Sequence, residues 1–224
     1  MTITQRLSLA FSLLAISLFA VVAVSLSVIS GFQSRFEYVQ VNAIPSIKDL
    51  NKSISTTSQL GIAFYRHQTA LDSAGQAAAE ERINSLLNTL KSLTDYYMAN
   101  DISSDEDKAM TEQAYRNIEA VRAALPAFLA ASRNHDNALS LSLLKSEDGL
   151  GAASRKMEAD FTNQIELNVK IGDALREQNK TIYAKTWWMM TSAAAVVILL
   201  LGLFSINIIQ GIKRSLNSIK STMT

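Results

Sequence analysis

The residue types that carry most enzyme chemistry are scarce in this chain of 224 residues. It has no cysteine and only two histidines, His67 and His135. Thiolate catalysis, disulfide bonds and cysteine-ligated metals are therefore excluded. The sequence also lacks a glycine-rich phosphate loop, a Gly-x-Ser-x-Gly nucleophile elbow and a His-Glu-x-x-His zinc motif. We therefore expect no enzyme activity, no cofactor and no metal site.

The dense acidic run Asp105-Glu106-Asp107 directly follows Ser104. A serine with a carboxylate three residues later is typical of a helix start, where such side chains bind free backbone N–H groups near the positive helix end. We interpret the run as a helix cap with a solvated face, and calcium binding is the less favoured alternative.

The composition favours helices as the elements that position any site. Hydrophobic residues make up 48% of the chain and aromatic residues only 7%, with 2 prolines and 8 glycines. Few prolines and glycines suit helices, and sparse aromatic residues do not suit a large sheet. The net charge of +1 argues against nucleic acid as a partner.

Two uncharged runs are long enough to cross a membrane. The first extends from Leu7 to Ser34, and the second extends from Thr186 to Ile212 with the core AAAVVILLLGLFSI. A bilayer core requires about 20 apolar residues in a helix. A cleaved signal peptide ending at Val21-Val22-Ala23 is the alternative for the first run, but the apolar residues continue past that point.

The charged residues predict the orientation of the chain. All 20 acidic residues lie between Arg35 and Lys185. The flanks carry only basic residues: Arg6, Lys213, Arg214 and Lys220. Purely basic flanks favour the cytoplasmic side, and two spans place both ends on that same side. The middle of the chain is therefore predicted to lie outside the cytoplasm.

Heptad spacing divides this middle part into four helical stretches. The expected core positions are Ile47, Leu50, Ile54, Thr57, Gly61, Phe64, Gln68 and Leu71; Ile83, Leu86, Leu90, Leu93 and Tyr97; Ala114, Ile118, Val121, Leu125, Phe128, Ser132, His135 and Leu139; and Met157, Phe161, Gln164, Asn168, Ile171, Leu175, Gln178 and Ile182. Heptads of this length imply helices packed at shallow angles in a bundle. Pro45 and Pro126 are expected to distort their helices locally.

Breaks at residues 72–75, 100–104 and 146–149 separate the four stretches, with the fourth starting near Asp148. No flexible linker interrupts the first and fourth stretches before the apolar runs, so we expect mechanical continuity. The predicted fold is all-α, an antiparallel up-down four-helix bundle continuous with two transmembrane helices. The predicted segments are a cytoplasmic N-terminus (1–6), a first transmembrane helix (7–32), a periplasmic bundle (33–186), a second transmembrane helix (187–209) and a cytoplasmic C-terminal segment (210–224).

Five polar residues occupy heptad positions that usually hold apolar side chains: Gln68, Gln164, Asn168, Gln178 and His135. One interpretation is control of helix register, because a buried amide stabilises one pairing of helices at some cost in stability. The other is a soft bundle that can switch between two packings. A metal-binding role for His135 is disfavoured because His67 lies on another helix.

Several motifs resemble the sensor region of methyl-accepting chemotaxis receptors. They are Ile44-Pro45-Ser46-Ile47 followed by Leu50 and Ile54, then Arg66, Ser104-Asp105-Glu106, and Leu167-Asn168. The segment from Ile212 to Ile219 resembles the opening of a HAMP domain, with Ser215 where that opening normally carries proline. The resemblance implies a homodimer in the bacterial inner membrane, in which ligand binding moves the fourth helix and HAMP relays the motion. It also implies a cytoplasmic output beyond Thr224 that contacts signalling proteins.

The same resemblance implies a small chemoeffector, an organic acid or amino acid, bound near the membrane-distal end across the dimer interface. Arg66 lies two residues from both Phe64 and Gln68, so its side chain should point away from its own bundle core. A guanidinium group suits carboxylate recognition, and Tyr65 and Thr69 offer hydroxyl groups nearby. Arg155 is predicted at a similar height on the fourth helix. The alternative is that both arginines are ordinary solvated surface residues.

Three functions fit these features. The favoured one is the sensor segment of a chemoreceptor. The second is the input half of a sensor histidine kinase or diguanylate cyclase, which residues after Thr224 would distinguish. The third is a structural or adaptor membrane bundle without a small ligand, although polar core positions are unfavourable for a purely structural bundle.

Overall fold

The computed structural model describes the backbone of residues 3–147 and 149–223, and the side chains of residues 4–147, 149–214 and 217. Within these residues all regular elements are helical. They are α1 (Ile3–Tyr38), the π-helix η1 (Val39–Ala43), α2 (Ile44–Thr69), α3 (Ser73–Asn100), α4 (Asp105–Arg133), α5 (Asn137–Lys145) and α6 (Leu150–Met223). The chain forms two compact units: Phe36–Ala174, the bundle unit, and Met1–Arg35 with Leu175–Thr224, the terminal unit.

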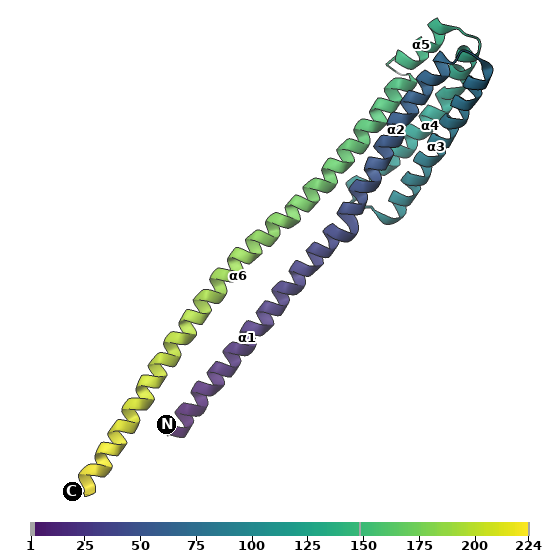
Figure 1. Cartoon of the computed structure of the whole chain (residues 1–224). Coiled ribbons are helices and arrows are strands. Elements are labelled where there is room, and N and C mark those ends of the chain that lie inside the picture. Colours follow the sequence, from purple (N-terminus) through teal and green to yellow (C-terminus); the bar gives the residue numbers. More distant parts are fainter. Residues whose placement is uncertain (1–2, 148, 224) are drawn as a thin grey trace. The chain divides into compact units, whose positions relative to one another are not determined.

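The bundle unit confirms the predicted all-α four-helix bundle. Its long helices α2, α3, α4 and the first part of α6 alternate in direction, and the short α5 lies at one end (Figure 1). Each contributes an apolar stripe to one core, where Phe64 and Phe128 meet edge to face with their centroids 5.8 Å apart. The fully buried large core residues include Leu60, Ile83, Leu87, Leu90, Ile118, Leu144, Leu150 and Met157.

The predicted breaks between helices are confirmed by their caps. The Asp72 carboxylate accepts a hydrogen bond from the Gly75 N–H at 2.7 Å and starts α3. The Ser104 hydroxyl accepts from the Asp107 N–H at 3.1 Å and starts α4, so the helix-start interpretation of the acidic run is confirmed. α5 ends at Lys145 and α6 begins at Leu150, whereas the expected start at Asp148 lies outside the described residues.

The prediction that the third helix continues through His135 to Leu139 is wrong. α4 ends at Arg133, and His135 adopts a left-handed backbone conformation with φ of 54°. A separate helix, α5, follows because the Asp136 carboxylate accepts from the Leu139 N–H at 3.0 Å and caps a new N-terminus. His135 and Leu139 are consequently exposed rather than in the core.

Several other predicted core positions are exposed or only partly buried, among them Leu71, Gln178 and Gln68. Leu71 is 96% exposed because α2 ends at Thr69 and the following residues are extended. Gln178 is exposed and belongs to the terminal unit. Gln68 is partly buried, and the neighbouring His67 takes the fully buried position instead.

The distortion expected at Pro45 lies just before that residue. The Ile44 N–H donates to the Val39 carbonyl, which widens the turn into the π-helix η1. Pro45 has no N–H and so makes no bond to the residue four positions earlier, which suits the helix start that follows a widened turn. Pro126 lies inside α4, which continues to Arg133.

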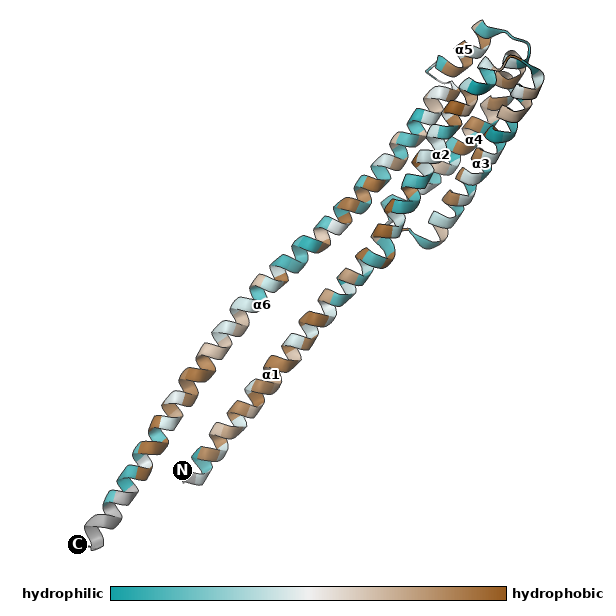
Figure 2. Ribbon diagram, in the orientation of Figure 1, coloured by the Kyte–Doolittle hydropathy of each residue, from teal (hydrophilic) through white to brown (hydrophobic). Residues whose placement is uncertain are grey.

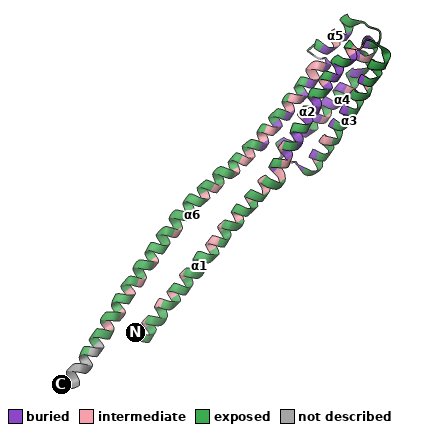
Figure 3. Ribbon diagram, viewed as in Figure 1, coloured by how far each residue is buried: buried purple, intermediate pink, exposed green. Residues whose placement is uncertain are grey.

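The terminal unit contains two helical stretches long and apolar enough to cross a membrane. Their most apolar 18-residue windows have mean hydropathies of 2.6 in α1 and 2.5 in α6. Figure 2 shows these stretches in brown, and Figure 3 shows that their residues are mostly exposed. Large exposed apolar side chains such as Phe19 and Ile198 require an apolar environment. Both helices therefore fit a membrane protein. In the same unit, the Arg35 guanidinium on α1 donates to the Asn179 side-chain carbonyl on α6.

Candidate functional site

Tyr65, Arg66 and Thr69, which the sequence singles out for ligand binding, lie together on one exposed face of α2. Tyr65 is 45% exposed, and the Thr69 hydroxyl donates to the Tyr65 carbonyl at 2.9 Å. Arg66 is exposed, as expected of a residue that points away from its own core. Among the described residues no hydrogen bond or ion pair engages its guanidinium group. The three side chains therefore form an accessible cationic and hydroxylated surface, which we call the Arg66 face.

Arg155 lies on α6 and is also exposed. Within the part of the chain that the structure describes, no hydrogen bond or ion pair joins it to the Arg66 face. The grouping of Arg155 with Arg66 in one site therefore stays a prediction.

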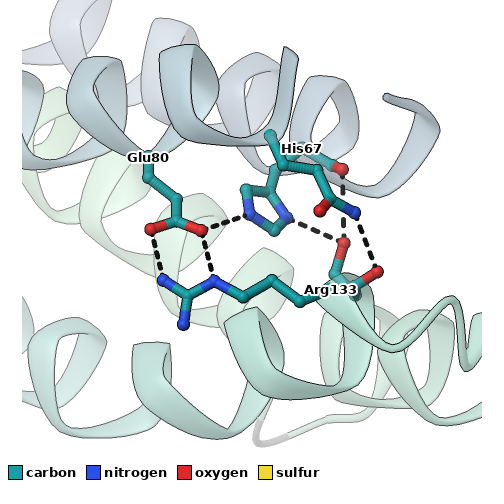
Figure 4. Close-up of polar contacts among 5 residues, drawn as sticks. His67, Glu80 and Arg133 are labelled. Carbon is teal, nitrogen blue, oxygen red and sulfur yellow. Dashed lines mark hydrogen bonds and ion pairs between the residues drawn. The ribbon is translucent and has the colours of Figure 1, made fainter. Parts of the chain in front are cut away.

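A buried polar cluster, which sequence reasoning missed, lies at the α5 end of the bundle (Figure 4). His67 is fully buried, with Nδ1 2.7 Å from the Ser132 hydroxyl and Nε2 2.9 Å from the Glu80 carboxylate. Arg133 also donates two hydrogen bonds to the Glu80 carboxylate, one from Nε at 2.6 Å and one from Nη2. The Gln76 amide donates to the Ser132 carbonyl at 3.1 Å, so the cluster joins α2, α3 and α4.

The ion pair and hydrogen bonds of this cluster have a structural role, because they join helices to one another. The hydrogen bonds from Arg133 hold the pKa of the Glu80 carboxyl below its usual value, although partial burial opposes the shift. The serine, histidine and carboxylate resemble a catalytic set by type only, because His67 and Ser132 are buried beyond the reach of a substrate. The heptad spacing could have indicated the burial of His67, because a core position three residues after Phe64 falls on His67 and one four residues after it falls on Gln68.

A second buried polar cluster lies at the η1 end of the bundle and centres on Asp107, which is fully buried. Its carboxylate accepts from the Tyr97 hydroxyl at 3.0 Å, from the Ser103 N–H at 2.8 Å and from the Gln164 amide at 2.6 Å. The Asn168 amide donates to the Tyr97 hydroxyl at 2.9 Å. Burial raises the pKa of Tyr97, with the nearby Asp107 charge adding to the effect.

These contacts give the polar core positions a physical role. From α6, the Gln164 amide donates to Asp107 on α4 and the Asn168 amide donates to Tyr97 on α3. Each hydrogen bond can form in only one position of α6 along its axis. Sliding α6 by one turn would remove the Gln164 donor from the Asp107 carboxylate and the Asn168 donor from the Tyr97 hydroxyl, both in the buried core. The geometry supports the interpretation in which buried amides control helix register.

A groove of about 1380 Å³ lies between α2 and α3, and its lining includes Lys48, Asn84, Asn88, Thr89 and Tyr96. It does not include the Arg66 face. Among the described side chains no group of three or more His, Asp or Glu residues is arranged to hold a metal ion.

The arrangement of one four-helix bundle with apolar stretches in its first and last helices matches a known family. A model of the four helix bundle sensory module for signal transduction matches residues 1–183. The chain belongs to this family. The four-helix-bundle sensory module occurs in methyl-accepting chemotaxis proteins, where it is a signalling input domain. A search of curated proteins finds no match.

The family assignment covers the bundle unit and the first apolar stretch, and it ends before the second apolar stretch. The chain is therefore a sensory module of the chemoreceptor type with helices that fit a membrane protein. Residues 184–224, including the segment that resembles the opening of a HAMP domain, lie outside the match.

Proposed function

We propose that this sensory module detects a small carboxylate-bearing molecule, an organic acid or amino acid, outside the cytoplasm and signals across the bacterial inner membrane. The observation that carries the proposal is the family match over residues 1–183. The Arg66 face supports the ligand class, because an unpaired exposed guanidinium is suited to bind a carboxylate with two parallel hydrogen bonds. In this proposal Arg155 contributes from α6.

The signal would pass along α6. This helix continues without a break from Leu150 to Met223, from the bundle core through the second apolar stretch. A displacement of its first turns along the axis would be transmitted to the residues after Ile212, because backbone hydrogen bonds make a helix stiff along its axis. A homodimer with a HAMP domain and a cytoplasmic output after residue 224 completes the proposed receptor.

The proposed orientation places the bundle in the periplasm and both chain ends in the cytoplasm. The charge distribution supports it, since the purely basic flanks surround a middle segment that holds all 20 acidic residues. A kinase or cyclase receptor would use the same input module. The output after residue 224 distinguishes these classes, and the chemoreceptor is favoured by the proteins in which the family occurs.

The test is a thermal-shift screen of the full chain in detergent against amino acids and small organic acids. A ligand that binds only the folded state raises its stability by about 2.7 kcal/mol at one hundred times the dissociation constant. We expect a hit among carboxylates that is lost in Arg66→Ala. Arg116→Ala is the matched control, because Arg116 is an exposed arginine on α4 whose Nε donates to the Gln113 side chain at 2.9 Å.

The two variants separate the outcomes. A carboxylate that still stabilises Arg66→Ala would contradict the assignment of Arg66 while leaving the receptor function in place. No stabilisation of the folded wild-type chain by any carboxylate would contradict direct sensing of this ligand class.

A further inference from the structure

Two buried aspartates of the bundle unit, one on α2 and one after α3, lie close enough for their side chains to interact. Asp49 lies in the second turn of α2 and is 9% exposed, and Asp101 follows the end of α3 and is 3% exposed. One Asp101 oxygen, Oδ2, has no hydrogen-bond partner among the described residues. Two ionised carboxylates cannot hydrogen-bond to each other, because neither carries a proton to donate. A single proton bound by the pair would therefore supply the donor for a hydrogen bond between the two carboxylates.

The groups around the pair do not neutralise both charges. Lys52 binds the Asp49 carboxylate at 2.6 Å, and its side chain is 53% exposed. Its charge also acts on Asp101 and opposes the rise in the Asp101 pKa, but burial and the Asp49 charge have larger effects. The other titratable groups near the pair are Tyr96 and Tyr97 on α3, Asp107 at the start of α4 and Tyr38 at the end of α1. α6 contributes the neutral amides of Gln164 and Asn168. Asp107 adds a further negative charge, so the environment of Asp101 favours a neutral carboxyl.

We propose that Asp49 and Asp101 form a proton-binding site that fastens the start of α2 to the turn between α3 and α4 in acid and loosens this attachment at neutral pH. Protonated Asp101 gains an O–H that donates to Asp49 across the gap between α2 and this turn. Ser46 already links the same elements, since its hydroxyl donates to the Asp101 carbonyl at 3.1 Å. The site lies at the opposite end of α2 from the Arg66 face, so a receptor built on this module would respond to pH independently of its small ligand.

The direction of the effect follows from the ionisation of Asp101. Burial raises the pKa of the Asp101 carboxyl to about 6, and the Asp49 charge adds to the shift. The folded state therefore binds more protons than the unfolded state between the usual pKa of an aspartate and about pH 6. Stability falls as the pH rises through this window and increases as the pH falls through it.

The first measurement is the thermal unfolding midpoint of the full chain in detergent at pH 5 and pH 7. We expect Asp101→Asn, which resembles the protonated carboxyl, to unfold at a higher temperature than wild type at pH 7. The difference should shrink at pH 5, where wild-type Asp101 is itself protonated. Asp95→Asn is the matched control: Asp95 is an exposed α3 aspartate whose pKa is held low by Lys91, so its effect should not shrink in this way.

The second measurement is hydrogen exchange of the backbone amides in residues 44–50, corrected for the intrinsic dependence of exchange on pH. Wild type should exchange these amides more slowly at pH 5 than at pH 7, and Asp101→Asn and Asp49→Asn should lose that difference. A pH-independent gap in unfolding temperature between wild type and Asp101→Asn would overturn the proposal. Equal protection of residues 44–50 at both pH values in wild type would overturn it as well.

Discussion

At the scale of single residues, Asp107 shows how one side chain can serve as a cap and as a core anchor. It belongs to an acidic run, yet it is fully buried while its neighbour Asp105 is exposed. Burial of a carboxylate is costly unless several donors reach it. Tyr97, Ser103 and Gln164 provide those donors from α3, the α3–α4 turn and α6. The side chain therefore couples three parts of the bundle.

Replacing Asp107 by alanine should destabilise the chain severely. The change leaves the Tyr97 hydroxyl and the Ser103 N–H without their carboxylate acceptor, and it removes one of the acceptors of the Gln164 amide. We expect the loss to amount to about 3–5 kcal/mol. The measurement is urea unfolding of the full chain, followed by helical circular dichroism. Asp105→Ala is the matched control and should cost less than about 1 kcal/mol, since Asp105 is exposed in the first helical turn. Equal losses in the two variants would contradict the anchoring role of Asp107.

At the scale of elements, the backbone packs closely at the turn from α5 into α6. A Cβ added at Gly149 would lie 2.3 Å from the Leu143 carbonyl oxygen, and one at Gly151 would lie 2.6 Å from the Leu144 carbonyl oxygen. Both obstacles are backbone atoms, which cannot rotate away. Glycine is thus required where α5 ends and α6 begins.

Gly149→Ala and Gly151→Ala should each lower stability by about 1–3 kcal/mol, because the added methyl group forces α5 away from α6. Gly172→Ala should instead raise stability by up to about 1 kcal/mol, because this glycine lies in the interior of α6 and its Cβ would meet nothing within 4 Å. Thermal unfolding of the three variants side by side checks both signs. An increase in stability on Gly149→Ala would contradict the requirement for glycine, because the backbone of the turn would then have moved to accept the methyl group.

The elements also show where heptad reasoning succeeds and fails. Leu86, Val121 and Phe161 lie in the core as their spacing predicts, because an apolar side chain repeated at steps of three and four must face the other helices. His135 and Leu139 continue the same spacing, but the Asp136 cap starts a new helix and interrupts it. Periodicity does not report where a helix stops. Nor does it identify partners such as His67 with Glu80 or Asp49 with Asp101, which meet only through packing of different helices.

At the scale of the whole molecule, the sequence predicts topology from charge, whereas the fold by itself has no preferred side of a membrane. The absence of cysteine makes this prediction testable with single introduced thiols. Ala78 is exposed on α3 in the bundle unit, and Asn217 is exposed near the end of α6. Neither alanine nor asparagine is buried there, so a cysteine at either position should leave the fold intact.

In right-side-out membrane vesicles, a membrane-impermeant maleimide should label Ala78→Cys without treatment and Asn217→Cys only after detergent is added. The reason is that an excess of lysine and arginine retains the flanks in the cytoplasm, while the acidic middle segment is translocated. The wild-type chain, which has no thiol, is the control for background labelling. Labelling of both cysteines before detergent would mean that the second apolar stretch does not span the bilayer. The α6 route for the signal would then be wrong, although the family of the sensory module would be unaffected.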